Sequence, residues 1–206
     1  MFKRIFQLLL ISFALNAGAQ ASVDTSTPDA LVKDVTEEVL ATLRTDPSIK
    51  SGDVKKAAAL VETSVLPHFN FTRMTALAVG REWRTATDEQ KKQLTDEFRT
   101  LLVRTYSNAL TSFRNQTVEY RPFKMAPTDT DVTVRTQIIQ PGGRPIPIDY
   151  ALEKQDAGWK VYDVMVAGVS LVTNYRETFA AEMRTGGVEG LVKSLHTKNT
   201  TTTAAK

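Results

Sequence analysis

Residues 159–166 read Trp-Lys-Val-Tyr-Asp-Val-Met-Val, and this stretch decides the class of fold that the chain can adopt. Successive side chains of a β-strand point to opposite faces of its sheet. The stretch is apolar on both faces, with Tyr162, Val164 and Val166 on one and Trp159, Val161 and Met165 on the other. Because both faces must then be covered, we expect a central strand with other elements packed on each side.

The residues before this stretch repeat the strand pattern. Alternating apolar positions begin at Thr117, resume over residues 132–138, and continue over residues 146–152 after the turn Pro141-Gly142-Gly143. A second turn, residues 155–158, leads into the stretch 159–166. Short turns between successive strands predict sequential hairpins of one antiparallel sheet.

Helical periodicity occupies the chain on both sides of these strands. Thr27-Pro28-Asp29 begins a helix whose apolar residues recur every four positions, and Thr87 with Gln90 forms a capping box for a long helix that ends near Ser112. After the strands, Ser170 caps another helix and Gly186-Gly187 stops it. The remaining expected helices start near Asp53, follow Asn70, and span residues 188–195. Together with the strands they predict an α+β fold.

The first twenty-one residues have the layout of a secretory signal peptide. Lys3 and Arg4 precede an apolar run over residues 5–15, and small residues ending in Ala19-Gln20-Ala21 follow. That run is too short for a permanent membrane helix, which needs about 20 residues. We expect cleavage after Ala21, with Ala19 as the alternative position, and export to a bacterial periplasm. Residues 22–196 are predicted to form a single domain, and the Thr-rich tail 197–206 is predicted to be disordered.

The composition excludes several classes of function. The chain has no cysteine, so disulfides, thiolate zinc sites, iron–sulfur clusters and cysteine nucleophiles are excluded. Its two histidines, His68 and His196, form no H-x-x-x-H pair, so no metal site is expected. Removal of Lys3 and Arg4 leaves 24 of the 26 basic residues against 23 acidic ones. This near balance predicts no nucleic-acid partner.

Two questions stay open from the residues alone. Asp163 lies in an apolar strand and could be the general base of a periplasmic enzyme, although an isolated strand aspartate is more often held by backbone groups or an arginine. The many apolar side chains could fill a solid core, as in a structural adaptor that binds no ligand, or could surround a hollow. Periodicity does not distinguish a filled core from a cavity.

Three segments are similar to those of a known family. They are residues 66–74 (Leu-Pro-His-Phe-Asn-Phe-Thr-Arg-Met), residues 79–84 (Val-Gly-Arg-Glu-Trp-Arg), and the region that runs from Tyr150 through the stretch 159–164 to Gly-Val-Ser-Leu-Val-Thr-Asn-Tyr-Arg at 168–176. In this order they resemble the MlaC family, also called toluene-tolerance or Tgt2-type proteins, over essentially the whole mature chain. Asn70 departs from the family pattern, which has Asp there, but both residues can cap a helix.

The resemblance implies a periplasmic phospholipid carrier rather than an enzyme. Such proteins hold acyl chains in a deep apolar cavity, enclosed by a curved antiparallel sheet of about four to five strands that helices back. They exchange lipid with a lipoprotein–porin complex in the outer membrane and an ABC-type transporter complex in the inner membrane, which maintains the lipid asymmetry of the outer membrane. Bound phospholipid would be cargo, no cofactor is expected, and nothing demands more than a monomer.

The resemblance also directs a choice of site residues. The acyl chains are expected to contact inward positions of the strands and flanking helices, namely Val132, Val134, Ile146, Ile148, Tyr150, Val164, Val166, Val169, Leu171, Tyr175, Leu102, Tyr106 and Leu110. The headgroup phosphate is expected to meet Arg135, Arg144 or Arg176, or else the backbone amides of residues 168–170. No catalytic residue is expected.

Overall fold

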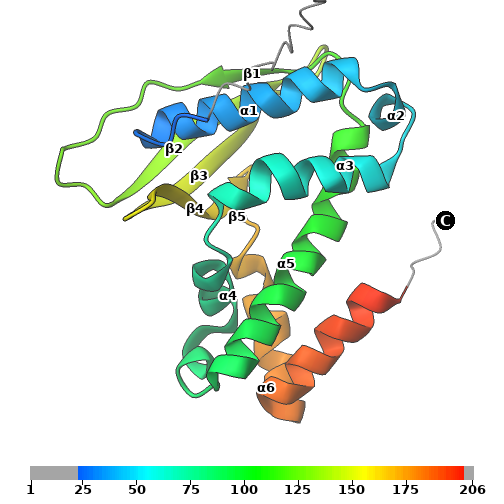
Figure 1. The fold of residues 1–206 in the computed structure, drawn as a ribbon, viewed down its shortest axis with the longest axis vertical. Coiled ribbons are helices and arrows are strands. Elements are labelled where there is room, and N and C mark those ends of the chain that lie inside the picture. Colours follow the sequence, from blue (N-terminus) through cyan, green and yellow to red (C-terminus); the bar gives the residue numbers. More distant parts are fainter. Residues whose placement is uncertain (1–22, 202–206) are drawn as a thin grey trace, which may run out of the picture.

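The sheet of the protein is a five-stranded antiparallel meander in the computed structural model, which describes residues 23–201 (Figure 1). Neighbouring strands in the sheet are also neighbours along the chain, so the predicted sequential hairpins are confirmed. The predicted signal segment, residues 1–21, lies outside the described residues. The strands are β1 (Thr117–Tyr120), β2 (Asp131–Ile139), β3 (Ile146–Gln155), β4 (Gly158–Val166) and β5 (Val169–Ser170).

The strand expected at the centre of the sheet, β4, lies inside it but next to the short edge strand β5. β4 pairs with β3 on one side and only with the two-residue β5 on the other. Farther along this outer edge, Phe69 forms an isolated parallel bridge with Val161, whose carbonyl accepts a 2.8 Å hydrogen bond from the Asn70 amide. The predicted cover on both faces of β4 is confirmed, since Tyr162 packs in one apolar cluster and Trp159 and Val161 pack in another.

A β-bulge changes which side chains of β4 share a face. The register between β3 and β4 shifts after Ala151, which pairs with Asp163, because Leu152 pairs with Val161 and leaves Tyr162 as the extra residue. Val164 therefore packs in the same apolar cluster as Trp159 and Val161, not on the opposite face as simple alternation predicts. Tyr162 instead packs against an apolar cluster formed mainly by the helices at residues 71–79, 88–111 and 176–200.

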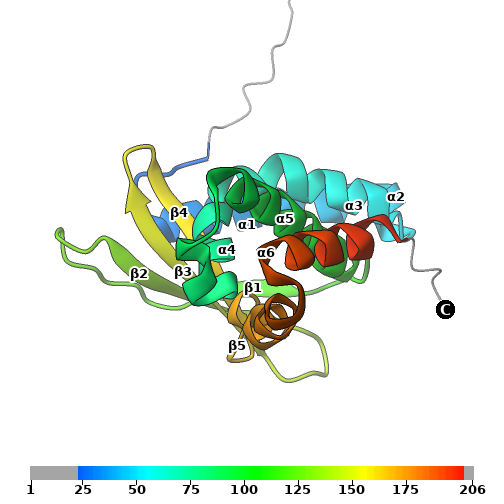
Figure 2. The same ribbon diagram turned by 90° about the horizontal axis from the view of Figure 1, so that it is seen from below.

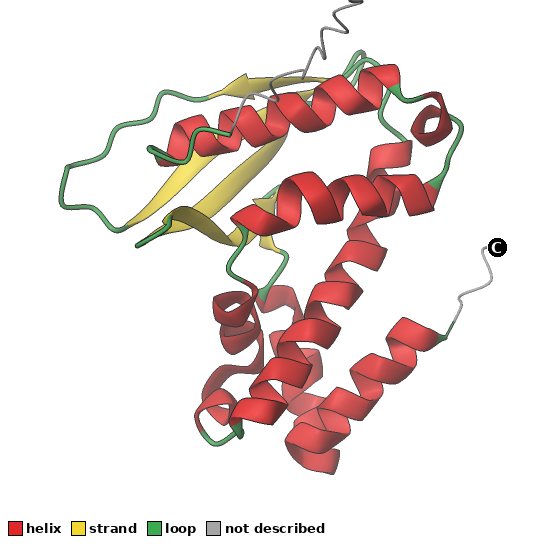
Figure 3. Ribbon diagram, viewed as in Figure 1, coloured by secondary structure: helices red, strands yellow, loops and turns green. Residues whose placement is uncertain are grey.

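Helices precede and follow the sheet, as predicted, and the resulting α+β fold is confirmed (Figure 3). Before the sheet, short π and 3-10 turns interrupt the helical run. The helical elements are α1 (Pro28–Thr45), α2 (Pro47–Lys50), α3 (Val54–Leu60), the π turn η1 (Val61–Val65), the 3-10 turns η2 (Leu66–His68) and η3 (Gly80–Arg84), α4 (Phe71–Val79), α5 (Asp88–Thr111), the 3-10 turn η4 (Thr173–Tyr175) and α6 (Arg176–Thr200).

Side chains cap the helix starts that the sequence identifies. Thr27 accepts from the Ala30 amide at 3.3 Å and Asn70 accepts from the Arg73 amide at 3.0 Å. At the start of α5, the capping box is complete, because Thr87 Oγ1 accepts from the Gln90 amide and Gln90 Oε1 accepts from the Thr87 amide. These caps satisfy amides that have no partner within the helix, so they fix where each helix begins.

The C-terminal helical segment differs from the prediction at both of its ends. Ser170 lies before the turn η4 and does not begin a helix; its Oγ accepts hydrogen bonds from the amides of Val172 and Thr173. Between these ends the predicted stop at Gly186-Gly187 is confirmed, because Gly187 has the non-helical angles φ 64° and ψ −166° and α6 consists of two helices that meet there at a kink. Residues 197–200, predicted to be disordered, are helical because α6 continues to Thr200, and the prediction for residues 202–206 lies outside the described range.

Three apolar clusters organise these elements. α1 lies along one face of the sheet, while α4, α5 and α6 form a helical lobe beside it (Figures 1 and 2). The lobe cluster centres on Phe98 and Phe179, the sheet cluster joins Leu31 of α1 to Trp159, and a third cluster surrounds Ile49 at the other end of α1. This arrangement leaves the middle of α1 between two clusters.

Candidate functional site

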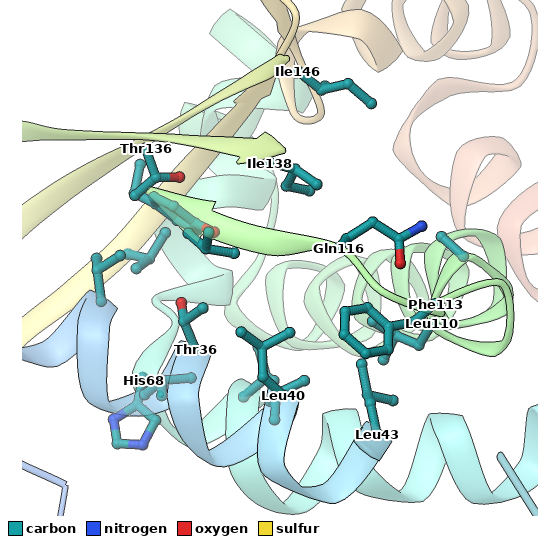
Figure 4. Close-up of a pocket in the computed structure, with 18 of the residues that line it drawn as sticks. Thr36, Leu40, Leu43, His68, Leu110, Phe113, Gln116, Thr136, Ile138 and Ile146 are labelled. Carbon is teal, nitrogen blue, oxygen red and sulfur yellow. The ribbon is translucent and has the colours of Figure 1, made fainter. Parts of the chain in front are cut away.

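A cavity of about 380 Å³ lies between α1, the sheet face that α1 covers, and the C-terminal end of α5 (Figure 4). This volume falls in the lower part of the range of about 300–1,000 Å³ found for small-molecule sites. The structure therefore contains a hollow where the sequence left open a choice between a hollow and a solid core.

One stripe of α1 supplies a whole wall of the cavity. The stripe has helical spacing, so its side chains lie on one face. Twelve steps of about 1.5 Å separate its first and last residues, which gives the wall a length of roughly 18 Å. All members of the stripe are aliphatic except one threonine, and they are Leu31, Val32, Val35, Thr36, Val39, Leu40 and Leu43.

The opposite wall comes from the sheet. Thr136 and Ile138 of β2 are two residues apart and therefore face the same side, as do Ile146 and Tyr150 of β3. Val161 of β4 closes the end of the wall near the start of α1. The pleat of three successive strands thus presents a mainly aliphatic surface to α1.

The end of α5 and the turns beside it form the mouth of the cavity. Leu110 and Phe113 line it from one side, with Gln116 next to them, and Ile138 and Ile146 lie across from them (Figure 4). Two further lining residues at this end, Ala109 and Ser112, are exposed. The other end, at Leu31 and Val161, is buried. The cavity therefore opens between α5 and the turn that joins β2 to β3.

The few polar groups of the cavity are mainly hydroxyls. The Thr136 Oγ1 donates a 3.1 Å hydrogen bond to the Ile148 carbonyl oxygen. Burial raises the pKa of the Tyr150 phenol above its ordinary value, while contacts with Thr36 and Thr136 act in the opposite direction. Tyr150 is therefore a neutral hydroxyl at physiological pH, and it adds no charge to the cavity.

His68 also lines the cavity, and histidine is the side chain whose ordinary pKa lies closest to neutral pH. Burial lowers the pKa of His68, and the positive charge of Lys160 lowers it further, whereas Glu38 acts to raise it. The imidazole is therefore neutral at pH 7. The cavity as a whole thus presents an uncharged, mostly aliphatic lining.

Asp163, the candidate general base, has a structural role at the turn between β4 and β5. Its carboxylate accepts hydrogen bonds from the Val164 amide at 2.8 Å, the Ser170 hydroxyl at 2.6 Å and the Val172 amide at 3.3 Å. It does not line the cavity. These bonds match the interpretation of Asp163 as a residue held by neighbouring backbone groups.

Two further features of residues 23–201 bear on function. Among these residues, no group of three or more His, Asp or Glu side chains is placed so that it could hold a metal ion. Within the same range, no helix combines the length and the apolar character needed to cross a membrane.

Three of the predicted acyl-chain residues line the cavity: Ile146, Tyr150 and Leu110. The others lie elsewhere. Val134 is buried in the sheet cluster with Val132 and Val164 packed against it, and Ile148 is buried in β3. For these four residues, contact with lipid stays a prediction.

The remaining predicted residues belong to the lobe or to the β4–β5 turn. Leu102 is buried in the lobe cluster, where Tyr106 and Tyr175 pack against it. Val169 is 56% exposed at the turn. Val166 and Leu171 are half-buried on either side of the same turn. None of these six lines the cavity, and their contact with lipid also stays a prediction.

The three predicted headgroup arginines differ in their surroundings. Arg135 lies 3.9 Å from Asp149, and Arg176 donates two hydrogen bonds to the Leu77 carbonyl oxygen in the lobe. Arg144 lies in the turn between β2 and β3, near the mouth residues Gln140 and Ile146. Only Arg144 of the three is therefore placed beside the mouth.

The main site element that sequence reasoning missed is the α1 stripe. Its spacing of four identifies a buried helix face, and a buried face is usually solid core. The wide apolar arc that includes both Val35 and Leu40, with Thr36 between them, was the available signal. An arc of that width indicates contact with more than one surface.

Comparison with known proteins assigns the family. A model of the family described as MlaC protein matches residues 33–197, which is most of the chain. The chain belongs to the MlaC family. A similar protein of Haemophilus influenzae, the intermembrane phospholipid transport system binding protein MlaC, is 21% identical over 196 residues, covering 94% of this chain and 92% of that protein.

Two further relatives extend the MlaC comparison. The toluene tolerance protein ttg2D of Pseudomonas putida is 32% identical over 104 residues, covering 50% of this chain and 48% of that protein. A solved structure of a phospholipid-binding protein from Ralstonia solanacearum, in complex with a phospholipid, is 44% identical with a TM-score of 0.77. The match covers 83% of this chain and 96% of that one. The predicted family is therefore confirmed.

Proposed function

We propose that this MlaC family member is a phospholipid carrier whose cavity between α1 and the sheet holds acyl chains. The observation that carries the proposal is the uncharged, aliphatic lining of a cavity that opens at one end. A ligand for such a lining must be apolar over most of its surface, because buried polar groups without hydrogen-bond partners destabilise a complex. The phospholipid complex of the R. solanacearum relative supports the same choice of ligand.

The length of the cavity suits an acyl chain. The α1 stripe from Leu31 to Leu43 is roughly 18 Å long. One leaflet of acyl chains fills half of a hydrocarbon core of about 30 Å, which is roughly 15 Å. A chain of the length found in membranes therefore fits along the stripe, with its free end at the buried end of the cavity.

The energetics explain why a carrier is needed and what it leaves to its partners. Two acyl chains hold roughly 30 methylenes, and at about 0.8 kcal/mol each their exposure to water would cost about 24 kcal/mol. A cavity that resembles a bilayer interior removes most of that cost. Because the bilayer and cavity terms nearly cancel, the carrier sets no direction, and its partners do.

The mouth is where the headgroup of a lipid inserted in this way would lie. Gln116 and Gln140 line this end, and Arg144 lies in the adjoining turn, all beside solvent. A guanidinium there could bind phosphate through paired N–H donors. We assign the headgroup role to Arg144 ahead of Arg135 and Arg176, whose guanidinium groups face other partners.

The wider role follows from the family. We propose that the exported chain works in the periplasm as a monomer without a cofactor. It exchanges phospholipid with a lipoprotein–porin complex of the outer membrane and an ABC-type transporter complex of the inner membrane, and so maintains outer-membrane lipid asymmetry.

Extraction of the purified protein with organic solvent, followed by mass spectrometry, tests the proposal. We expect phospholipid in stoichiometric amount. A chain that carries no lipid after gentle purification would instead fit a ligand-free adaptor. An enzyme centred on Asp163 would lose turnover in Asp163→Ala while its lipid content stayed unchanged.

A further inference from the structure

A second hollow lies directly behind one wall of the acyl-chain cavity. It is a groove of about 430 Å³ between the segment around η2, the start of α4, the middle of α5 and the β3–β4 hairpin. Residues 65–70 separate the two hollows. Val65 and His68 face the cavity, and Leu66 and Pro67 face the groove. Phe69 lines both.

Phe69 is placed to act as a movable partition. Its backbone is fixed, because it bridges to Val161 and the next amide donates to the Val161 carbonyl. Its ring is half-buried and packs against both the lobe cluster and the sheet cluster, with the Phe71 ring stacked at 5.9 Å on the lobe side. A rotation about its side-chain bonds would therefore join the hollows without moving the strand.

The residues before Phe69 depart from regular α-helix. A π turn and a 3-10 turn, η1 and η2, precede it, and such interruptions of a helix often accompany functional sites. The buried Nδ1 of His68 has no hydrogen-bond partner within residues 23–201. An unpaired buried polar atom makes the closed arrangement less stable than a fully satisfied one.

The groove differs from the cavity in its charge. Arg99 of α5 and Lys160 of β4 line it, together with the carboxylates of Glu62 and Asp96. The Lys160 Nζ donates to the Pro67 carbonyl oxygen at 2.6 Å, so this ammonium lies against the partition. Asp96 is paired with Lys92 at 2.8 Å, whereas Arg99 is exposed and takes part in none of the ion pairs found among residues 23–201. Arg99 and Lys160 are therefore available to an anionic group.

We propose that the groove is a second opening of the acyl-chain cavity, gated by Phe69, where Arg99 and Lys160 bind the phosphate of a phospholipid that enters or leaves by this route, whereas a lipid seated fully in the cavity has its headgroup at the mouth beside Arg144. The inference rests on the proposed carrier function. A diacyl lipid has two tails, and the stripe of α1 offers the length of one, so the joined hollows provide room that the closed cavity lacks. The phosphate meets cations at the partition while the tails pass it into the apolar side.

The absence of cysteine from the chain permits a direct test. Single thiols are introduced in the groove (Thr72→Cys), at the cavity mouth (Ser112→Cys) and at a remote exposed position (Arg84→Cys). Each full-length mature variant is mixed with phosphatidylcholine vesicles that contain phosphatidylethanolamine with a maleimide on its amine. The thiol adds to the maleimide, and intact mass measures the rate of adduct formation.

We expect Thr72→Cys to react about tenfold faster than Arg84→Cys, since binding concentrates the headgroup in the groove. Adding Arg99→Glu should lower that rate about tenfold, whereas the same charge reversal at Arg84 should not change it. Adding Phe69→Leu to Thr72→Cys should raise the rate of reaction at the Thr72→Cys thiol, because leucine is apolar but smaller than phenylalanine. Circular dichroism checks that each variant is folded.

The outcomes separate this inference from the carrier function. Equal rates for Thr72→Cys and Arg84→Cys, with fast reaction of Ser112→Cys, would overturn the second opening and leave the carrier intact. If Thr72→Cys reacted quickly and adding Arg99→Glu did not lower its rate, the proposed phosphate site would be wrong. Slow reaction at all three positions, in a protein from which no phospholipid is extracted, would reject the carrier function as well.

Discussion

A carboxylate placed on the α1 stripe should weaken lipid binding by an amount that pH controls. Val39 lies on the stripe roughly 12 Å from Leu31 and 6 Å from Leu43, at 1.5 Å per residue. An acyl chain that follows the stripe must pass it. In Val39→Glu the chain would therefore displace the water that hydrates the new carboxylate.

The least costly way to accommodate the chain is to protonate that carboxyl group. Between pH 7 and the ordinary glutamate pKa of about 4.3 lie 2.7 units, and each unit costs about 1.36 kcal/mol, so protonation costs about 3.7 kcal/mol or a factor of about 500. At pH 5 the same reasoning gives about 1 kcal/mol, or a factor of about five. Affinity of the variant should thus recover as the pH falls.

Ala41→Glu is the matched control, because Ala41 lies on the exposed face of the same helix. Equilibrium partition of labelled phospholipid between vesicles and protein, at pH 7 and at pH 5, measures the affinity of each variant. Circular dichroism confirms that both are folded. If Val39→Glu bound lipid as tightly as Ala41→Glu, or if its deficit did not change with pH, the acyl chain would not run along this stripe.

Three further predictions concern stability. Arg73→Met should lower the free energy of unfolding by about 2 kcal/mol, because the Arg73 guanidinium donates to the carboxylates of Asp131 and Glu153 and lies 3.5 Å above the Tyr162 ring. Urea unfolding measures this change, and a decrease of less than about 0.5 kcal/mol would contradict the prediction. Ala167→Asn should stabilise the β4–β5 turn by about 0.5–1 kcal/mol, since Ala167 has φ of 51° and Asn tolerates that region; a lower melting temperature would refute this. Burial raises the pKa of Tyr162 to about 12, with its hydrogen bond to Asp131 adding to the effect. Because the folded pKa is the higher one, the contribution of Tyr162 to the free energy of unfolding should be constant below about pH 10 and fall as the pH rises toward 12. Comparison with Tyr162→Phe isolates this contribution, and tyrosinate absorbance near pH 10 that is present in the folded protein but missing from Tyr162→Phe would contradict the prediction.

Local sequence signals predicted most of the helices, strands and turns, but not which residues pack around them. The capping box at Thr87 and the turn at Pro141-Gly142-Gly143 act within a few residues, so they could be recognised without the rest of the structure. The bulge at Tyr162 could not, because it depends on the register between β3 and β4. For the same reason, strict alternation placed Val164 on the wrong face.

The candidate site was harder to predict because a cavity wall and a core face have the same composition. Leu110, Ile146 and Tyr150 were chosen as inward positions and do line the cavity, whereas Leu102 and Tyr106, on the same helix as Leu110, meet the lobe instead. α5 passes from the lobe to the cavity, so its inward face changes partner along its length (Figure 1). No pattern within one helix encodes where that change occurs.

The ends of α1 explain why a hollow persists beneath its middle. Leu31 and Val32 are buried against Trp159 and Val161 in the sheet cluster. At the other end, Leu43 is buried with Ile49 and Ala57, against the last turn of α5. These two anchors fix the height of the helix above the sheet, and the side chains between them are too short to fill the gap that the curved sheet leaves. Closing the hollow would require moving one end of α1 away from its buried cluster, which would expose apolar side chains or leave a new cavity there. The hollow is thus a consequence of how α1 is anchored at its two ends, by residues such as Leu31 and Leu43 that also form the ends of the cavity wall.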